Sequence, residues 1–435
     1  METVKKYRDF IVRIANLNTS LGAVFLGVLL GLFIKFCVPL TRYSLAYMNF
    51  PALWLLRMLH AVTTPLVCTS VIVGVCGRKV GVSGKIAGSA SAYWVATTFL
   101  SVTLGLMLVL VIKPGVDAVE NTHREKFSLA CAVLDVLHNI FQTNFVLGAS
   151  RQHKTLRTKS RYVEQTNILG LIVWSYVVGT CMALLPRESP VRKICLVLNR
   201  ATTIVVNYIL GFLPFGVVLM VACLVVEAKD WELILKLGKF TGVVALGLVI
   251  HATVVLPLIY VVFARHNPYA IIKGLFPALK TAFISSSSSA TLPLTLKCCE
   301  EGLNINKKIC RLLLPIWTKN NINGSVIYEV VAAIFIAQLN NLRLDFSQLI
   351  VIVMVSAVPC QGGTGTRARG AVTTFLNLTV AGLPGREVSL LVVTQYLLDR
   401  CNTILNILGD CIGVALLDQV SKRSQGDIEG QREEM

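Results

Sequence analysis

Three polar clusters interrupt apolar sequence in the last third of the chain: SSSSS at 285–289, KNNINGS at 319–325 and GGTGTRARG at 362–370. A helix that crosses a bilayer cannot expose such backbone to lipid, because its N–H and C=O groups find partners only within the protein. The clusters are therefore tolerated only where they are buried in protein or line a cavity. Interrupted helices at the bilayer midplane are typical of secondary transporters. The pattern predicts two re-entrant hairpins and two interrupted or polar helices over about 268–420.

The composition of the whole chain is that of a membrane protein. Of its 435 residues 54% are hydrophobic and 15% are charged, and the mean hydropathy is +0.69. Soluble proteins are about 45–50% apolar and roughly 25% charged, so ordinary cytosolic and disordered proteins are excluded. The net charge of +18 comes from Lys and Arg in short loops between apolar runs, as membrane topology requires, so no nucleic-acid partner is expected. The thirteen cysteines are scattered and mostly lie in apolar runs, which indicates small buried hydrophobes rather than disulfides or zinc ligands.

Six apolar stretches precede the interrupted region, at about 21–38, 53–75, 86–112, 168–185, 203–226 and 241–264. Each approaches or exceeds the roughly 20 residues that a spanning helix needs. The first stretch is too long for a cleaved signal peptide, and no small-residue cleavage site follows it. The basic loops between the stretches place the N-terminus on the cytoplasmic side. We expect an all-α polytopic membrane protein with eight transmembrane helices and two re-entrant helical hairpins.

The chain divides into three parts on this interpretation. Residues 1–267 form a scaffold, whose early helices also contribute to transport, and residues 268–420 form a transport core. The segment 421–435 is a polar cytoplasmic tail that we expect to be disordered. The basic segment 116–162 is the best candidate for a variable surface loop.

One helix near the C-terminus carries polar residues on a single face. Asp399, Thr403, Asn406 and Asp410 are spaced by 4, 3 and 4 residues, and Asn402 lies on the neighbouring edge. Ionisable groups within a membrane are costly and face a cavity or a partner. The pattern favours a site for a ligand and a cation, and the alternative is a helix-packing face with Asp399 paired to Arg400.

The other two polar clusters offer further ligands. Asn321 and Asn323 supply amide oxygens suited to a hard cation such as Na⁺, although a plain Asn-Gly turn is equally compatible with this sequence. The serine cluster has apolar helical flanks, so a hairpin tip that binds a carboxylate at helix N-termini is favoured over a linker. No His/Cys metal spacing, phosphate-binding loop or nucleophile motif is present, and an enzyme is not expected.

The sequence resembles the excitatory amino-acid transporter family, the sodium/dicarboxylate symporters. The likeness covers about 20–420 and is carried by SSSSATLP at 286–293, YEVVAAIFIAQ at 328–338, and Asp399-Arg400 with Asn406 and Gly409-Asp410. It implies a homotrimer in the plasma membrane that contacts lipid and binds an amino acid. Each protomer would move a transport domain like an elevator against a fixed scaffold, with the second hairpin as the outer gate. Sodium would be the coupling ion, with potassium and a proton as further coupling ions, and no other cofactor is implied.

The resemblance assigns the site residues by position. Ser287 and Ser288 would meet the substrate α-carboxylate, Asp399 would pair with the α-ammonium, and Thr403 and Ser325 would line the pocket. Two sodium sites follow, one from Asn321, Asn406, Asp410 and the carbonyl of Trp317, the other from Thr97, Thr98 and Asn321. Glu329 matches the acidic position linked to proton and potassium coupling, where neutral amino-acid relatives lack an acid.

Departures from the family pattern concentrate at the same site. A sodium-binding Asp is replaced by Asn323, a Thr by Lys319, and the Tyr partner of the threonine pair by Trp94. The Arg that reads a side-chain carboxylate is replaced by Asn402. The second hairpin reads Gly365-Thr-Arg367-Ala-Arg369-Gly370 where the family has Gly-Ile-Pro-Gln-Ala-Gly.

These departures predict altered coupling or substrate choice. Asp→Asn with Thr→Lys shifts the local charge by +2, which predicts weakened sodium binding. Arg367 and Arg369 would replace the missing Arg across the pocket, unless they form a solvated loop. The leading hypothesis is a sodium-coupled symporter for glutamate or aspartate. The alternatives are a neutral amino-acid carrier, because Asn402 can bond an amide or hydroxyl, and a transport-impaired anion channel or regulatory subunit.

Overall fold

The computed structural model describes residues 22–37, 42–76, 84–116, 138, 152–156, 159–163, 167–186, 188–227, 231–341, 344, 349–350, 352–353, 356 and 388–433. Within these the chain is helical apart from one short hairpin. A helix over Gly22–Cys37 is followed by α2 (Arg42–Cys76), α3 (Gly84–Ile112), β1 (Gln152–Leu156) and β2 (Lys159–Val163). Next come α6 (Ile168–Ala183), α7 (Pro190–Gly211), α8 (Leu213–Glu227), α9 (Trp231–Ile250), the π-helix η1 (His251–Val255) and α10 (Leu256–Ala264). The last elements are α11 (Pro268–Ser285), α12 (Ser288–Lys297), the π-helix η2 (Cys298–Gly302), α13 (Lys307–Asn320), α14 (Asn323–Leu339) and α17 (Val388–Glu433).

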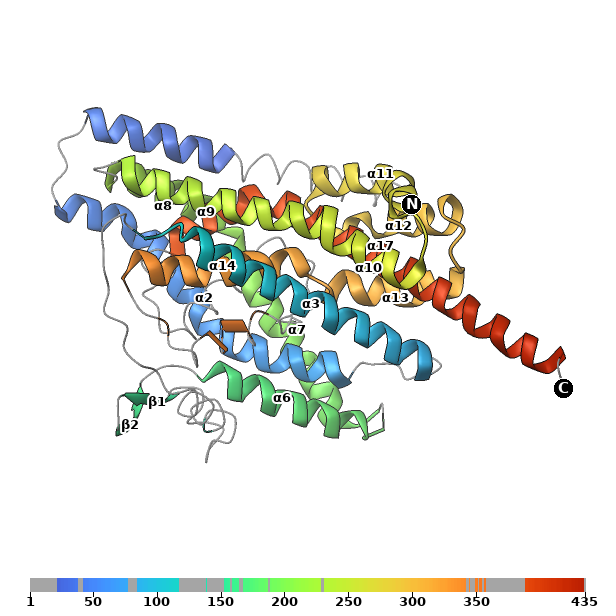
Figure 1. Cartoon of the computed structure of the whole chain (residues 1–435). Coiled ribbons are helices and arrows are strands. Elements are labelled where there is room, and N and C mark those ends of the chain that lie inside the picture. Colours follow the sequence, from blue (N-terminus) through green and yellow to red (C-terminus); the bar gives the residue numbers. More distant parts are fainter. Residues whose placement is uncertain are drawn as a thin grey trace, which may run out of the picture.

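The helices form a bundle of long, roughly aligned elements (Figure 1). By length and composition, four helices among the described residues can cross a membrane, or five if the bent pair α7–α8 counts as one span. Shorter apolar helices lie at Gly22–Cys37, Thr64–Cys76 and Gly170–Ala183. The fold is therefore that of an all-helical polytopic membrane protein.

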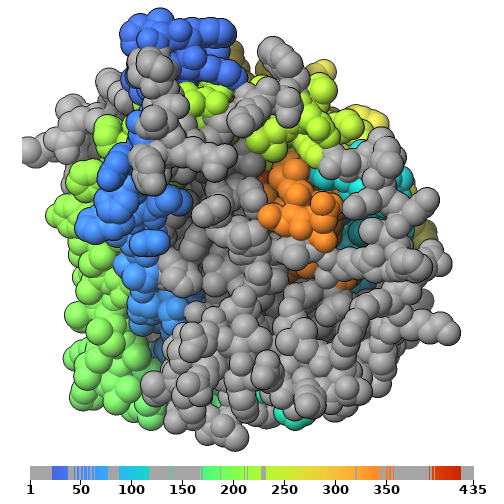
Figure 2. All heavy atoms as spheres, turned by 90° about the vertical axis from the view of Figure 1, so that its left-hand side faces the viewer, coloured from blue at the N-terminus to red at the C-terminus, as the bar shows by residue number. Residues whose placement is uncertain are grey.

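Two sets of helices are distinguished by their contacts. Helix α2 packs against α6, α7 and α8, whereas α14 packs against α3, α9 and α17. Helix α17 also contacts α11, α12 and α13, and its contact with α8 joins the two sets. The backbone N–H of Gly115 beyond α3 donates to the Gln338 side chain of α14 at 3.0 Å. Figure 2 views the bundle from one end, where atoms in the orange of α14 lie beside atoms in the teal of α3.

Two expectations differ from the structure. The apolar stretch 203–226 is not one straight helix, because α7 and α8 meet at a 49° bend beside Pro214. The polar tail is not irregular, since α17 continues to Glu433. The basic segment predicted as a surface loop includes β1 and most of the antiparallel β2, a hairpin that does not conflict with that prediction.

Both predicted breaks within the described part of the transport core are present. Helix α11 ends at Ser285 and α12 begins at Ser288, so the first hairpin turns within the serine cluster. Helix α13 ends at Asn320 and α14 begins at Asn323, within the second cluster. The third cluster, 362–370, lies outside the described residues.

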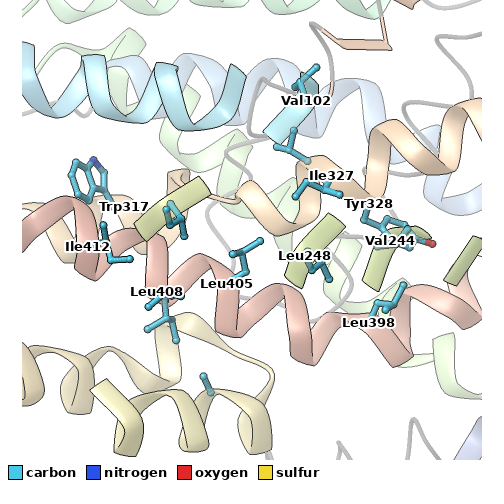
Figure 3. Packing of buried hydrophobic residues seen from close by; sticks show 14 of the residues in the cluster. Val102, Val244, Leu248, Trp317, Ile327, Tyr328, Leu398, Leu405, Leu408 and Ile412 are labelled. Atoms are coloured by element: carbon cyan, nitrogen blue, oxygen red, sulfur yellow. The ribbon is translucent and has the colours of Figure 1, made fainter. Parts of the chain in front are cut away.

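The hydrophobic core surrounds α14. Fourteen of its seventeen residues are buried, and Phe240 of α9 stacks on Phe335 with ring centroids 4.7 Å apart. Figure 3 shows Tyr328 of α14 and Leu405 of α17 between these two helices, while Ile327 of α14 lies toward Val102 of α3. The two interrupted elements are thereby held at fixed positions beside α17.

Candidate cation and substrate site

The break between α13 and α14 frees backbone groups in the centre of the protein. Asn321 leaves the helical conformation with φ −89° and ψ 95°, while its N–H still donates to the Trp317 carbonyl at 2.7 Å. Ile322 begins α14 without a side-chain cap. The first N–H groups of α14 therefore need acceptors from elsewhere, as at any helix start.

Helix α17 supplies acceptors at the break. The side-chain oxygen of Asn406 accepts the Gly324 backbone N–H at 2.9 Å, and the Asp410 carboxylate accepts a hydrogen bond from the Asn321 side-chain amide at 2.9 Å. Gly324 permits this approach, since a Cβ there would lie 2.9 Å from the Asn402 Cα. Asn406 and Asp410, two of the four residues that the 4-3-4 spacing placed on one face of α17, thus contact the helix break.

Several polar atoms at this junction are buried and have no hydrogen-bond partner among the described residues. They are the Asn321 Oδ1, the Asn323 Nδ2 and both side-chain polar atoms of Asn402, and each residue is 1% exposed. A buried polar atom without a partner costs about 1–3 kcal/mol, so such clusters indicate a site for a ligand or an ion. Carboxylate and amide oxygens are ligands for hard cations, and Asp410 provides the negative charge.

Helix α3 closes another side of the cluster. The Thr98 hydroxyl lies 3.5 Å from the Asn323 Oδ1, while the Thr97 hydroxyl donates to the carbonyls of Tyr93 and Trp94 at 3.0 and 3.1 Å. Both threonines are buried. The predicted pair therefore reaches the helix break through Thr98 and Asn323.

The tip of the first hairpin is organised by its own hydroxyl groups. The Ser287 hydroxyl caps α12 by accepting the Ala290 N–H at 3.3 Å. Ser286 adopts φ 46°, and its buried hydroxyl has no partner in the described parts of the chain. Ser288 is the first residue of α12 and is half-buried. Arg400 of α17 lies over the ring of Phe283, 5.6 Å from its centroid. The hairpin tip therefore lies near the Asp399–Arg400 segment.

Comparison with known proteins decides the family. The model of the sodium:dicarboxylate symporter family matches residues 17–420. The chain is 34% identical to excitatory amino acid transporter 3 of Mus musculus over 96% of the chain and 87% of that protein. It is 32% identical to excitatory amino acid transporter 1 of Ambystoma tigrinum, over 97% and 86%, and 33% identical to human neutral amino acid transporter A, over 97% and 84%.

The chain belongs to the sodium:dicarboxylate symporter family. In this family member the remaining predicted positions lie around the same junction. Thr403 is buried and donates to the Asp399 carbonyl at 2.8 Å, and Ser325 is half-buried in the first turn of α14. Glu329, 2% exposed, lies further along α14. Asp399 and Trp94 are half-buried.

Three predicted residues cannot be placed at the site. Lys319 is the penultimate residue of α13, but its side chain lies outside the described part of the structure. Arg367 and Arg369 also lie outside the described residues. Their assignments remain predictions from the sequence.

Sequence reasoning missed two groups that shape the site. The Tyr93 hydroxyl donates to the Gly409 carbonyl at 2.7 Å, and its ring stacks on Trp317 at 5.4 Å beside Gly413. His251 is fully buried in η1, 3.4 Å from the Ser101 hydroxyl. A histidine inside an apolar stretch was a signal for the second group, whereas the first depends on tertiary packing.

Proposed function

We propose that this protein is a secondary active symporter that moves acidic amino acids of the glutamate or aspartate type across the plasma membrane with sodium. The transport core over 268–420 moves like an elevator in each protomer of a homotrimer, and potassium and a proton complete the coupling. Support comes from the family and from its relatives, which include excitatory amino acid transporters. No catalytic role is assigned to any residue.

The observation that carries this proposal is the docking of Asp410 and Asn406 on the α13–α14 break. One carboxylate, two amide side chains and freed backbone groups converge there, and the Asn321 side-chain oxygen has no partner among the residues that the structure describes. A bound sodium ion would use that oxygen and would balance the buried charge of Asp410.

The same site predicts that sodium coupling is weakened. Asn323 is a neutral amide, 1% exposed, where the family pattern has a carboxylate. Two unit charges about 4 Å apart interact by roughly 4 kcal/mol at an effective dielectric constant of 20. One such loss lowers a binding constant by nearly a thousandfold, at about 1.4 kcal/mol per decade.

The test restores the charges and measures sodium dependence. Reconstituted wild type and the double variant Asn323→Asp with Lys319→Thr are compared for uptake of radiolabelled glutamate, aspartate and serine over a sodium titration. The double variant should reach half-maximal uptake at a lower sodium concentration. Lys193→Thr, at an exposed position of α7 outside 268–420, is the matched control and should leave the sodium curve unchanged. Equal sodium curves for wild type and double variant, at equal protein levels, would contradict the electrostatic account.

A second candidate, a neutral amino-acid carrier, is favoured by Asn402. Within the described part of the chain both polar atoms of its amide are buried without a partner, so the amide offers an N–H donor and an oxygen acceptor. A carboxylate can use only the donor, whereas a hydroxyl or amide substrate satisfies both atoms. Stronger competition by serine or glutamine than by glutamate would favour this candidate, and Asn402→Arg should then shift the preference toward glutamate. Ligand-gated anion current without uptake would instead assign the non-transporting alternative.

A further inference from the structure

Three buried thiols meet at a place that the proposed transport site does not use. Cys299, Cys310 and Cys411, called here the thiol cluster, are each 0% exposed. The sulfur atoms of Cys299 and Cys411 are 3.6 Å apart, and Cys299 also forms a side-chain hydrogen bond with Cys310. The three residues come from η2, α13 and α17, so the cluster joins the end of the first hairpin to both neighbouring helices.

The geometry allows a covalent bond with little movement. A disulfide needs about 2.05 Å between sulfur atoms, so Cys299 and Cys411 must approach by about 1.5 Å, which side-chain rotation and a small backbone shift supply. Cys299 contacts both other thiols, so thiol–disulfide exchange can pass a bond from one partner to the other. Simple core packing requires neither the thiol chemistry nor this arrangement.

The segment that carries Cys299 is irregular and reaches the edge of the core. Residues Cys298–Gly302 form a π-helical turn, in which the Leu303 N–H donates to the Cys298 carbonyl at 3.0 Å. Such turns are rare and occur mostly at functional sites. The last residues of the turn, Glu301 and Gly302, are exposed, so Cys299 lies two residues from solvent-exposed chain.

An ion pair near the surface holds this turn against α13. The Arg311 guanidinium donates to both carboxylate oxygens of Glu300, each at 2.8 Å, and 68% of the Arg311 side chain is exposed. Glu300 follows Cys299 directly, and Arg311 follows Cys310 directly. Release of the pair would let η2 lift from α13 and admit a small oxidant to the thiols.

We propose that Cys299 and Cys411 form a reversible disulfide when a hydroperoxide reaches the thiol cluster, with Cys310 as the exchange partner. One thiol attacks the peroxide O–O bond and becomes a sulfenic acid, and the leaving oxygen departs as water or alcohol. The second thiol then attacks that sulfur, so the S–S bond forms and a water molecule leaves. The two thiols are oxidised by two electrons in total, the peroxide is reduced, and a dithiol reductant reverses the change.

The bond would tie the first hairpin to α17 one residue from Asp410. It would therefore restrict the hairpin relative to the helix that carries the cation ligand. This consequence rests on the proposed function, whereas formation of the bond does not.

The experiment maps the bond in the full-length protein. Wild type in membranes is treated with hydrogen peroxide, free thiols are blocked with N-ethylmaleimide, and tryptic peptides are analysed by mass spectrometry. Trypsin releases Cys299 within 298–307 and Cys411 within 401–422. Cys298→Ala with Cys401→Ala leaves one thiol in each peptide, so the link is unambiguous. We expect a cross-linked pair two hydrogens lighter than the sum of the peptides, which disappears after dithiothreitol.

Variants of the cluster and of the ion pair sharpen the result. Cys299→Ala should abolish the link, and Cys411→Ala should shift it to the 309–311 peptide that holds Cys310. Glu300→Gln should raise the rate of linking, while Glu301→Gln, the matched control, should leave it unchanged. Oxidation of the exposed Cys181 without any link at Cys299 would overturn the proposal, as would a wild-type link between Cys299 and Cys310 alone.

A transport measurement separates this proposal from the proposed function. If the protein is a symporter, peroxide should lower sodium-dependent uptake by wild type but not by Cys299→Ala, and dithiothreitol should restore it. A protein that forms the link but shows no uptake before oxidation contradicts the symporter assignment and leaves the disulfide established.

Discussion

Helices α7 and α14 are both apolar, yet the structure uses them in opposite ways. Along α7 large hydrophobic side chains stay exposed, with Val197 at 66% and Tyr208 at 73%, whereas nearly all of α14 is buried. A helix that is apolar all round and buried in protein must satisfy any polar group internally, while an exposed apolar face depends on the bilayer. Accordingly, the buried Asn323 and Glu329 lie on α14, against α3, α9 and α17.

The largest effect expected from this contrast is at a glycine. Gly324→Ala places a Cβ 2.9 Å from the Asn402 Cα and 3.0 Å from its carbonyl oxygen, and neither backbone atom can move aside alone. Overpacking of this kind costs about 1–3 kcal/mol. We expect a lower thermal unfolding temperature in detergent micelles and a loss of sodium-dependent stabilisation.

The matched control is on α7. A Cβ at Gly211 meets no atom within 4 Å, so Gly211→Ala should raise stability slightly, because helical Gly costs roughly 0.5–1 kcal/mol relative to Ala. Equal unfolding temperatures for Gly324→Ala and Gly211→Ala would contradict the idea that α14 is closely packed and α7 is not.

The breaks in the helices were predictable because polar clusters are the local cause of a break. The serine cluster and the cluster around Asn321 each contain the residues between two described helices. The bend between α7 and α8 was not predicted, since the sequence around it stays apolar and only Pro214 marks it. The helical end of α17 was missed because a polar composition alone does not separate an exposed helix from an irregular tail.

At the site, the sequence indicates which residues are polar but not which of them meet. The spacing on α17 predicted a common face, and the resemblance supplied the roles. That Asn406 bonds the Gly324 N–H, and that Tyr93 reaches Gly409, depends on contacts across more than 80 residues of sequence. No local pattern encodes such contacts.

Removing a tyrosine hydroxyl from each helix tests the contrast between α14 and α7, and we expect an effect of intermediate size on stability. The Tyr328 hydroxyl on α14 donates to the Leu391 carbonyl at 2.5 Å and lies 3.2 Å from the Thr394 hydroxyl, with the ring fully buried. Tyr328→Phe should lower stability by about 0.5–1.5 kcal/mol, the net value of one hydrogen bond. Tyr208→Phe on exposed α7 should leave the unfolding temperature unchanged. If only Tyr208→Phe lowered the unfolding temperature, the hydroxyl on α7 rather than the one on α14 would be the stabilising group, which contradicts the contrast.

The smallest effect on stability is expected at the ion pair between Glu300 of η2 and Arg311 of α13, which lies at the surface. Arg311 holds the pKa of the Glu300 carboxyl below its usual range, chiefly through the hydrogen bonds between them. A lowered pKa in the folded protein means that the pair stabilises fully above the unfolded-state pKa of Glu, about 4.3. That contribution is lost as the pH falls through the lower pKa of the folded protein.

The unfolding temperature of Glu300→Gln should therefore lie below that of wild type at neutral pH and equal it in acid. Glu232→Gln removes the pair between the exposed Glu232 and Lys236, four residues apart on α9, and should give a smaller difference. That pair joins residues of one helix, whereas Glu300 and Arg311 join two elements of the core. If the difference for Glu300→Gln grew as the pH fell, the ion pair would not be its cause.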